Sequence, residues 1–153
     1  MEFKKIISTI LLIIWMVIIF LFSNEDAKLS QSKSDKVAVT TINTVSNITG
    51  KNYTKTDREN FIDNSRFFIR KTAHFTLYFI LGVLLIITYK CYGLNNRIII
   101  YSVLFCLIYA ISDEIHQLFS NGRTFKLLDI IIDTIGGLIG SLTIYYVKIK
   151  ARS

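Results

Sequence analysis

Four long apolar stretches alternate with charged segments along the 153-residue chain, at about residues 6–22, 67–89, 98–119 and 127–147. A helix of about 20 apolar residues crosses the hydrocarbon core of a bilayer, so each stretch is long enough to span a membrane. The first stretch is longer than the apolar part of a signal peptide. No small-x-small cleavage site precedes Glu25-Asp26, which favours a retained span. We therefore predict an all-α integral membrane protein, a four-transmembrane-helix bundle that forms a single domain over residues 1–153.

The polar segment between the first two spans, residues 23–66, has a helical pattern of its own. A weakly apolar face recurs at helical spacing and ends before Gly50, at Val37, Thr41, Val45 and Ile48. Such a face predicts an interfacial helix, which lies on the membrane surface or on the bundle instead of crossing. The sequence Thr56-Asp57-Arg58-Glu59 matches a capping box, which predicts a short helix that runs into the second span.

The composition agrees with a membrane protein and argues against a nucleic-acid partner. The chain is 52% hydrophobic, with a mean hydropathy of +0.46 and a net charge of +7. Its lysines and arginines flank the apolar stretches and form no stripe with interleaved aromatics, so we interpret them as anchors at the membrane surface. Cys91 in a predicted loop and Cys106 inside a span differ in depth, and we predict two free thiols.

Four spans place both chain termini on one side of the membrane. The compact basic segments fall on that side, at Lys4-Lys5, Lys90 and Arg97, and Lys148, Lys150 and Arg152. Short cytoplasmic loops are rich in Lys and Arg, so we predict cytoplasmic termini and an exterior segment 23–66. Arg70 and Lys71 then lie at the outer end of the second span, where the charge rule does not explain them.

Polar residues of the last three spans converge at this outer end. They are Arg70, Lys71, His74 and Tyr78 in the second span, Tyr109, Asp113, Glu114, His116 and Gln117 in the third, Arg123 in the next loop, and Asp129 and Asp133 in the fourth. We expect Asp113, His116 and Gln117 to share one helix face. Ionisable residues at membrane depth are costly and usually mark a functional site. Gly136 and Gly140 continue the fourth span, and their spacing favours close packing on a neighbouring helix.

Two interpretations of this cluster concern its charges. An ion-pair network would hold the ends of three helices together, although buried ion pairs rarely add net stability. A binding site for an anion is the other interpretation. Arg70, Lys71 and Arg123 suit a phosphate or carboxylate, which a planar guanidinium binds with two parallel hydrogen bonds.

Two further interpretations concern chemistry. Asp113 and His116, completed by His74 or an aspartate, offer metal ligands, as in carboxylate-rich sites of helix bundles. Their spacing matches no strong zinc signature, so the sequence assigns no metal and no cofactor. His116 beside Asp113 and Glu114 also suits general acid–base catalysis.

The motifs of the cluster resemble those of the VanZ-like family of bacterial membrane proteins. The matching pieces are Arg70-Lys71-x-x-His74-Phe75-x-x-Tyr78, Ser112-Asp113-Glu114-Ile115-His116-Gln117-x-Phe119, Gly122-Arg123, Asp129-x-x-x-Asp133-x-x-Gly136 and Phe20-Leu21-Phe22-Ser23. The chain departs from the family pattern at Leu77, Asn121 and Asp133, where many members carry an acidic residue, a proline and an asparagine. The departure at Leu77 argues against a mechanism that needs a carboxylate there.

The resemblance implies a multi-pass protein of the bacterial cell membrane. The founding member of the family is associated with resistance to teicoplanin, a glycopeptide with a lipid tail. The first hypothesis is therefore a resistance factor that binds membrane lipids, a lipid-tailed glycopeptide or a lipid-linked cell-wall precursor. Its predicted ligand-binding residues are Arg70, Lys71, Arg123, Tyr78, Gln117, Asp129 and Asp133.

The second hypothesis is a small membrane enzyme that acts on a lipid-linked phosphate or another cell-envelope substrate. Its catalytic residues would be His116 and Asp113, with Glu114 and His74, and an arginine clamp would hold the anion. A transporter is a third hypothesis. It would require an oligomer, because four spans are few for a transport path.

Overall fold

The structure is a computed structural model that describes residues 2–95, 97–119 and 124–149, with side chains as far as Val147. Within that part the chain is all-helical with short connections and has no strand, as predicted. The elements are α1 (Glu2–Ser23), α2 (Ala27–Thr49), α3 (Lys55–Cys91), α4 (Ile98–Gln117), α5 (Leu127–Ile144) and a short π-helical turn η1 (Tyr145–Ile149). Four of them, α1, α3, α4 and α5 with the start of η1, are long and apolar enough to span a membrane. The chain is therefore an all-α, multi-pass membrane protein by length and composition.

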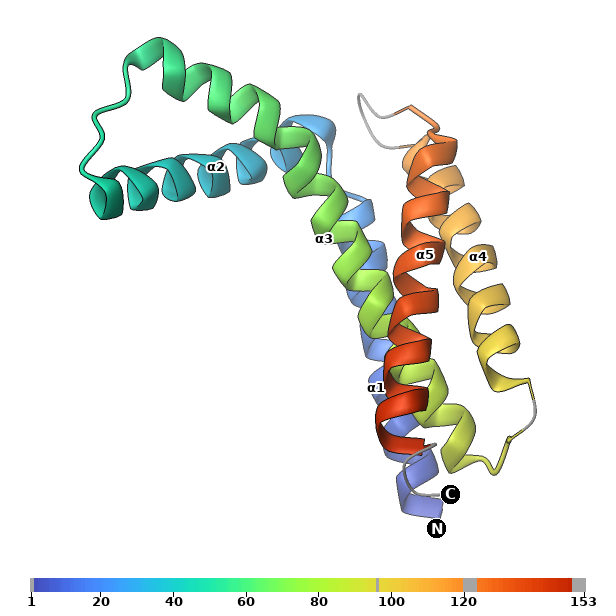
Figure 1. Cartoon of the computed structure of the whole chain (residues 1–153). Helices are drawn as coiled ribbons and strands as arrows, with labels where there is room; N and C mark the ends of the chain where they lie inside the picture. Colours follow the sequence, from blue (N-terminus) through green and yellow to red (C-terminus); the bar gives the residue numbers. More distant parts are fainter. Residues whose placement is uncertain (1, 96, 120–123, 150–153) are drawn as a thin grey trace.

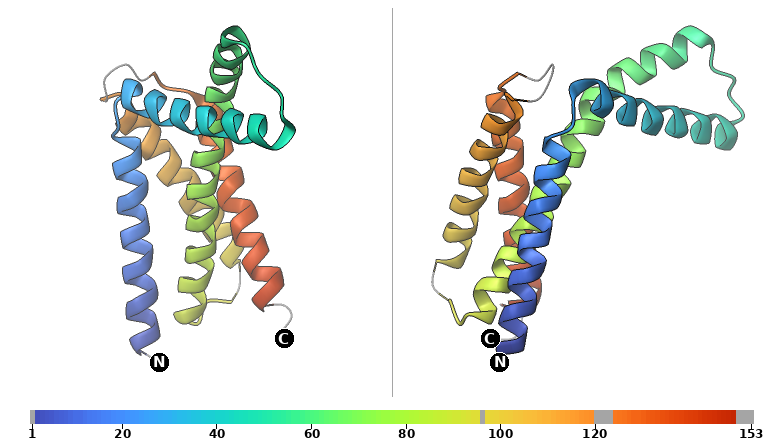
Figure 2. Two further views of the ribbon diagram at one scale, coloured as in Figure 1. Left: turned by 90° about the vertical axis from the view of Figure 1, so that its left-hand side faces the viewer. Right: turned by 180° about the vertical axis from the view of Figure 1, so that it is seen from behind.

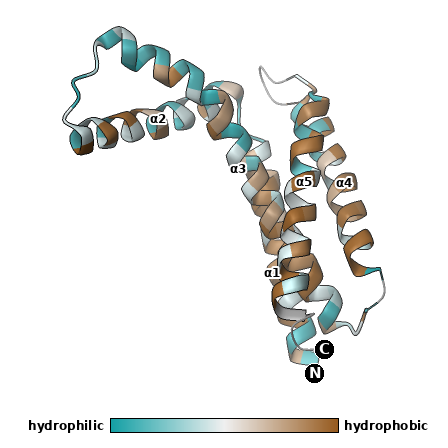
Figure 3. Cartoon of the chain, in the orientation of Figure 1, coloured by the Kyte–Doolittle hydropathy of each residue, from teal (hydrophilic) through white to brown (hydrophobic). Residues whose placement is uncertain are grey.

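The four spanning helices form a bundle with α3 at its centre (Figure 1). Helix α5 packs along α3, α4 packs on α5, and α1 packs on the other side of α3. The start of α1 and the end of η1 lie at the same end of the bundle (Figure 1). We call the opposite end, where α4 ends and α5 begins, the polar end. Figure 3 shows that the middle of the bundle is mostly hydrophobic and that hydrophilic residues lie toward its two ends and along α2 and the start of α3.

Glycines on α5 let it approach the backbone of α3 closely. Gly136 lies against the Phe75 carbonyl, and a Cβ placed there would be 2.6 Å from that oxygen. Gly140 lies even closer to the Phe79 carbonyl, and Gly82 of α3 faces the Gly137 carbonyl. The predicted packing of small residues in the fourth span is confirmed, and the partner helix is α3.

Helix α2 and residues 55–66 of α3 form an arm that projects to one side of the polar end (Figure 2). Asp35 of α2 holds the arm together through an ion pair with Arg66, and Arg58 donates a 2.6 Å hydrogen bond to Asn43. Helix α2 runs across the bundle axis instead of along it (Figure 1). The predicted helix between the first two spans is therefore present and does not cross the bundle.

The apolar stripe predicted for α2 is not the face that packs on the protein. The buried residues of α2 are Ser34, Ala38 and Ile42. Val37, Val45 and Ile48 stay exposed, together with Thr41. Val37 lines two pockets beside α3, whereas Thr41, Val45 and Ile48 leave an exposed stripe that suits contact with a membrane surface.

Several predicted boundaries shift by a few residues. The capping box consists of Thr54 and Asp57, two residues before the predicted one, with reciprocal backbone bonds of 3.2 and 3.1 Å. Cys91 is the last residue of α3 and not part of a loop, and both cysteines are free. Helix α4 ends at Gln117, two residues before the predicted end of the third span. Gly50 ends α2 in the left-handed region (φ 68°), as predicted.

Candidate functional site

Residues 63–71 of α3 line a pocket with several basic side chains at the polar end. Its volume is about 250 Å³, and its lining consists of Gln31, Asp63, Arg66, Phe67, Arg70, Lys71 and Lys126. These residues come from α2, α3 and the segment before α5. The arm is thus needed to form the pocket, which we call the basic pocket.

Two cations in the basic pocket are already paired. Arg66 forms ion pairs with Asp35 and Asp63. Lys71 forms an ion pair with Asp129, and its Nζ lies 5.3 Å from the centre of the Phe67 ring. Both partners of the Lys71–Asp129 pair are largely buried, with side-chain exposures of 15% and 12%. Their mutual pairing offsets the cost of burying each charge in the bundle.

Arg70 and Lys126 are the other two cations of the basic pocket. Within the described part of the chain neither forms an ion pair. They therefore leave positive charge in the pocket that is available for an anionic ligand. A guanidinium on a helix and an ammonium beside it suit phosphate or carboxylate oxygens.

An apolar groove lies next to the basic pocket, between α1 and α3. It has a volume of about 510 Å³ and is lined by Trp15, Phe22, Val37, Phe68, Ile69, Thr72, Ala73, Thr76, Leu77 and Ile80. The Trp15 indole donates a 2.9 Å hydrogen bond to the Leu77 carbonyl, which fixes the ring at the groove. Most of the lining is apolar, so the groove suits an acyl chain and not a hydrated ligand.

A smaller pocket of about 170 Å³ shares lining residues with both of these sites, and we call it the connecting pocket. It shares Arg70 with the basic pocket, and it shares Phe22, Val37, Ile69, Ala73 and Leu77 with the apolar groove. His74 also lines this connecting pocket. The three spaces therefore run from uncompensated cations at the polar end to an apolar groove along the bundle.

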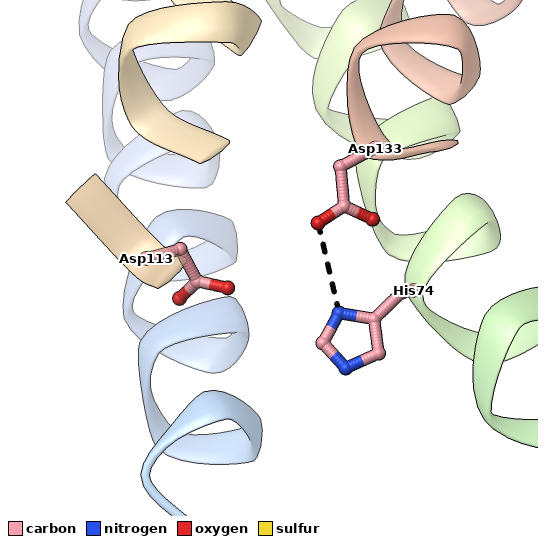
Figure 4. A group of neighbouring side chains, drawn as sticks. All are labelled: His74, Asp113 and Asp133. Carbon is pink, nitrogen blue, oxygen red and sulfur yellow. Dashed lines mark ion pairs between the residues drawn. The ribbon is translucent and has the colours of Figure 1, made fainter. Parts of the chain in front are cut away.

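Below the basic pocket, three helices bring His74, Asp113 and Asp133 together, and we call these residues the buried triad. One imidazole nitrogen of His74 and one carboxylate oxygen of each aspartate lie within 4.8 Å of one another. In Figure 4 the side chains of His74 and Asp133 face each other, with Asp113 on α4 pointing toward them. His74 Nδ1 and Asp133 Oδ2 are 3.8 Å apart, and Asp113 accepts a 3.2 Å hydrogen bond from Gln117.

Glu114 has a structural contact instead of a place in the buried triad. Its Oε1 accepts a 2.5 Å hydrogen bond from the backbone N–H of Lys126, the residue that precedes α5. The carboxylate therefore ties the end of α4 to the start of α5. Tyr78 lies deeper on α3, with 0% exposure, in the apolar core with Leu81, Cys106 and Ala110.

His116 lies apart from the aspartates, in contrast to the predicted shared face. Its ring stacks on Phe20 of α1 at a centroid distance of 4.4 Å, and its Nε2 is 3.3 Å from Asn24 Oδ1. Residues 113 and 117 point into the bundle, but position 116 is turned about 60° from 113, which brings it to α1. Of the two histidines, His74 is the one placed beside carboxylates. Arg123 and Gly122 lie outside the described residues.

Two of the four cations of the basic pocket, Arg66 and Lys126, were missing from the predicted site, as were its other lining residues Gln31, Asp63 and Phe67. Lys126 precedes the fourth span and resembles an ordinary membrane anchor in the sequence. Arg66 precedes the second span and has the same appearance. A signal that could have singled them out is their position, because each directly precedes a predicted span and lies within five residues of a predicted site residue.

The comparisons with known proteins agree with this architecture. No curated protein and no solved structure matches the chain. A family model described as VanZ/LLP1 matches residues 8–148, which include α1 from residue 8 onward, the other three spanning helices, the arm and every residue of the buried triad. On the strength of that match, over nearly its whole length, the chain belongs to the VanZ/LLP1 family.

Proposed function

We propose that this protein binds an anionic lipid, with the phosphate in the basic pocket and an acyl chain in the apolar groove. The observation that carries the proposal is the shared lining of the three spaces. Arg70 belongs to the basic and connecting pockets, and Leu77 belongs to the connecting pocket and the groove. A ligand with a charged head and an apolar tail matches this order of surfaces.

The chemistry of the basic pocket favours a phosphate over a neutral headgroup. Arg70 and Lys126 add two cations without described carboxylate partners, and each such cation near a membrane contributes about 1 kcal/mol to the binding of anionic lipid. The guanidinium of Arg70 also offers two parallel donors to one phosphate. A zwitterionic headgroup would bring its own cation into the same positive pocket, at a cost.

The proposed orientation places the polar end outside the cell and both termini in the cytoplasm. The basic loop between α3 and α4, with Lys90 and Arg97, supports it. In this orientation the exposed stripe of α2 lies on the outer membrane surface. In a background that lacks Cys91 and Cys106, a membrane-impermeant thiol reagent applied to intact cells should label Asn47→Cys and leave Leu94→Cys unlabelled. The reverse pattern would invert the orientation.

A direct test measures the affinity of the purified protein in detergent for two fluorescent lipids, phosphatidylglycerol and phosphatidylcholine. We expect the parent protein to prefer phosphatidylglycerol. Removing both unpaired cations in Arg70→Gln/Lys126→Gln should weaken phosphatidylglycerol binding about 10- to 30-fold, because two interactions of about 1 kcal/mol are lost. Phosphatidylcholine binding should change little.

The matched control is Lys28→Gln/Lys36→Gln, which removes two exposed lysines of α2 outside the lining of the three spaces. It lowers the net charge by the same amount and should keep the parent affinity. Equal loss in both double variants would mean that only overall charge matters. Such a result would contradict a localised headgroup site.

On the basis of family membership, we also propose that the same site contributes to resistance against lipid-tailed glycopeptides. A lipid-tailed glycopeptide such as teicoplanin presents a tail to the groove and anionic groups to the basic pocket. In cells that depend on this protein for protection, Arg70→Gln/Lys126→Gln should lose most protection against teicoplanin at matched membrane levels. Undiminished protection would show that resistance does not depend on the lipid site.

A further inference from the structure

The buried triad has features that neither lipid binding nor ion pairing explains. His74, Asp113 and Asp133 come from three different helices, and their ligand-type atoms lie within 4.8 Å of one another. We propose that they bind one divalent transition-metal cation, Zn²⁺ or Mn²⁺. Imidazole and carboxylate are common ligands of both ions in proteins.

The first argument is the state of the polar atoms. Asp133 has a side-chain exposure of 4%, and within the described part of the chain its Oδ1 has no hydrogen-bond partner. The Nδ1 of His74 also lacks one, because its 3.8 Å separation from Asp133 is too long for a hydrogen bond. Buried polar groups are normally satisfied, so these atoms point toward a missing ligand.

The second argument is the local charge. Two carboxylates bring two negative charges into the bundle, and His74 can contribute at most one positive charge. The cation nearest in sequence, Lys71, is already paired with Asp129. Gln117 gives Asp113 a neutral donor, which does not compensate charge. A divalent cation would neutralise both carboxylates with a neutral imidazole as the third ligand.

The third argument is geometry and access. Ligand atoms about 2.1 Å from a metal lie about 3.0 to 3.4 Å apart in octahedral or tetrahedral sites. Closing the triad from its present spacing requires movements of about 1 Å, which small side-chain rotations provide. His74 also lines the connecting pocket, so an ion can enter from the polar end. Three protein ligands leave at least one position for water.

The test measures metal content and affinity directly, in detergent without added lipid, so it is independent of the lipid proposal. The protein carries an affinity tag without histidine and the substitution Cys91→Ser, which removes the more exposed thiol. After treatment with chelator, it is titrated with Zn²⁺ and with Mn²⁺. We expect one equivalent of at least one ion per chain and a higher melting temperature with metal.

The decisive variants are Asp133→Asn and Asp113→Asn, which keep the side-chain shape and should each weaken metal binding about 100-fold or more. The control is Asp26→Asn, the same change at an exposed residue that makes no side-chain cap bond to α2, and it should bind like the parent. Where an asparagine variant does not purify folded, His74→Gln provides the same comparison. The metal site would be overturned if neither ion bound stoichiometrically, or if the triad variants kept the parent affinity. A protonated carboxylate would then account for the burial of the two aspartates.

Discussion

Replacing Gly140 by leucine is expected to abolish the folded bundle. In the native structure Gly140 contacts the Phe79 carbonyl so closely that even a Cβ would overlap the oxygen. A backbone carbonyl inside α3 cannot rotate away, so α3 and α5 must separate. Overpacking of a core usually costs about 1–3 kcal/mol, and an unyielding backbone contact raises that cost toward the whole stability of a small protein.

Fluorescence-detected gel filtration of the protein in mild detergent measures this effect as the yield of monodisperse protein. The matched control is Thr143→Leu, which places the same side chain one turn further along α5 at an exposed position. We expect the control to keep parental yield and Gly140→Leu to lose nearly all of it. Equal yields would show that this face of α5 does not pack on α3.

The second large effect is expected from breaking the buried ion pair between Lys71 and Asp129. The substitution Lys71→Met keeps the length of the side chain but removes its charge, so Asp129 stays buried without its partner. Removing one member of a buried pair typically costs about 3–5 kcal/mol. The free energy of unfolding, measured by denaturant titration in mixed micelles, should fall by about that amount.

A double variant separates the ion pair from simple packing at the same place. Lys71→Met/Asp129→Leu removes both charges and fills the space with apolar atoms, so it should recover most of the lost stability. The non-additivity of the two substitutions measures their coupling. If Lys71→Met alone is as stable as the parent, Asp129 has another partner and the pair is not needed for folding.

The spans and the helix packing could be predicted because they depend on local patterns. An apolar run of about 20 residues has few alternatives to a membrane span, and all four are present. The spacing of Gly136 and Gly140 indicated one close-packed face, and that face meets α3. Gly50 marked the end of α2, because glycine adopts the left-handed backbone conformation at little cost in energy.

The composition of the site was harder to predict, since it depends on which helices are neighbours. Spacing along α4 placed Asp113, His116 and Gln117 together, yet α4 contacts α1 on one side and α5 on the other. The ring of His116 therefore stacks on Phe20 of α1. The sequence placed His74 at this end of the bundle, but the three-dimensional arrangement was needed to show that His74, and not His116, lies beside the two aspartates.

The face of α2 that packs on the rest of the protein was equally hard to predict from the sequence. The sequence showed an apolar stripe on α2, but the face that packs on α3 is the neighbouring one, with Ala38 and Ile42. A stripe of moderate hydrophobicity fits a membrane surface and a protein surface equally well. Because α5 packs along α3, Arg66 and Lys126 line one pocket although 60 positions separate them in the sequence.

Photolabelling tests the central claim, a lipid site that joins the basic pocket to the apolar groove, most directly. The probe is phosphatidylglycerol with a photoreactive diazirine in one acyl chain, added to the purified protein and followed by peptide mass spectrometry. We predict labels on the groove residues of α1 and α3, such as Trp15, Phe68 and Thr76, and their loss in Arg70→Gln/Lys126→Gln. Labels spread evenly over all the apolar helices, or equally strong in that variant, would contradict the site.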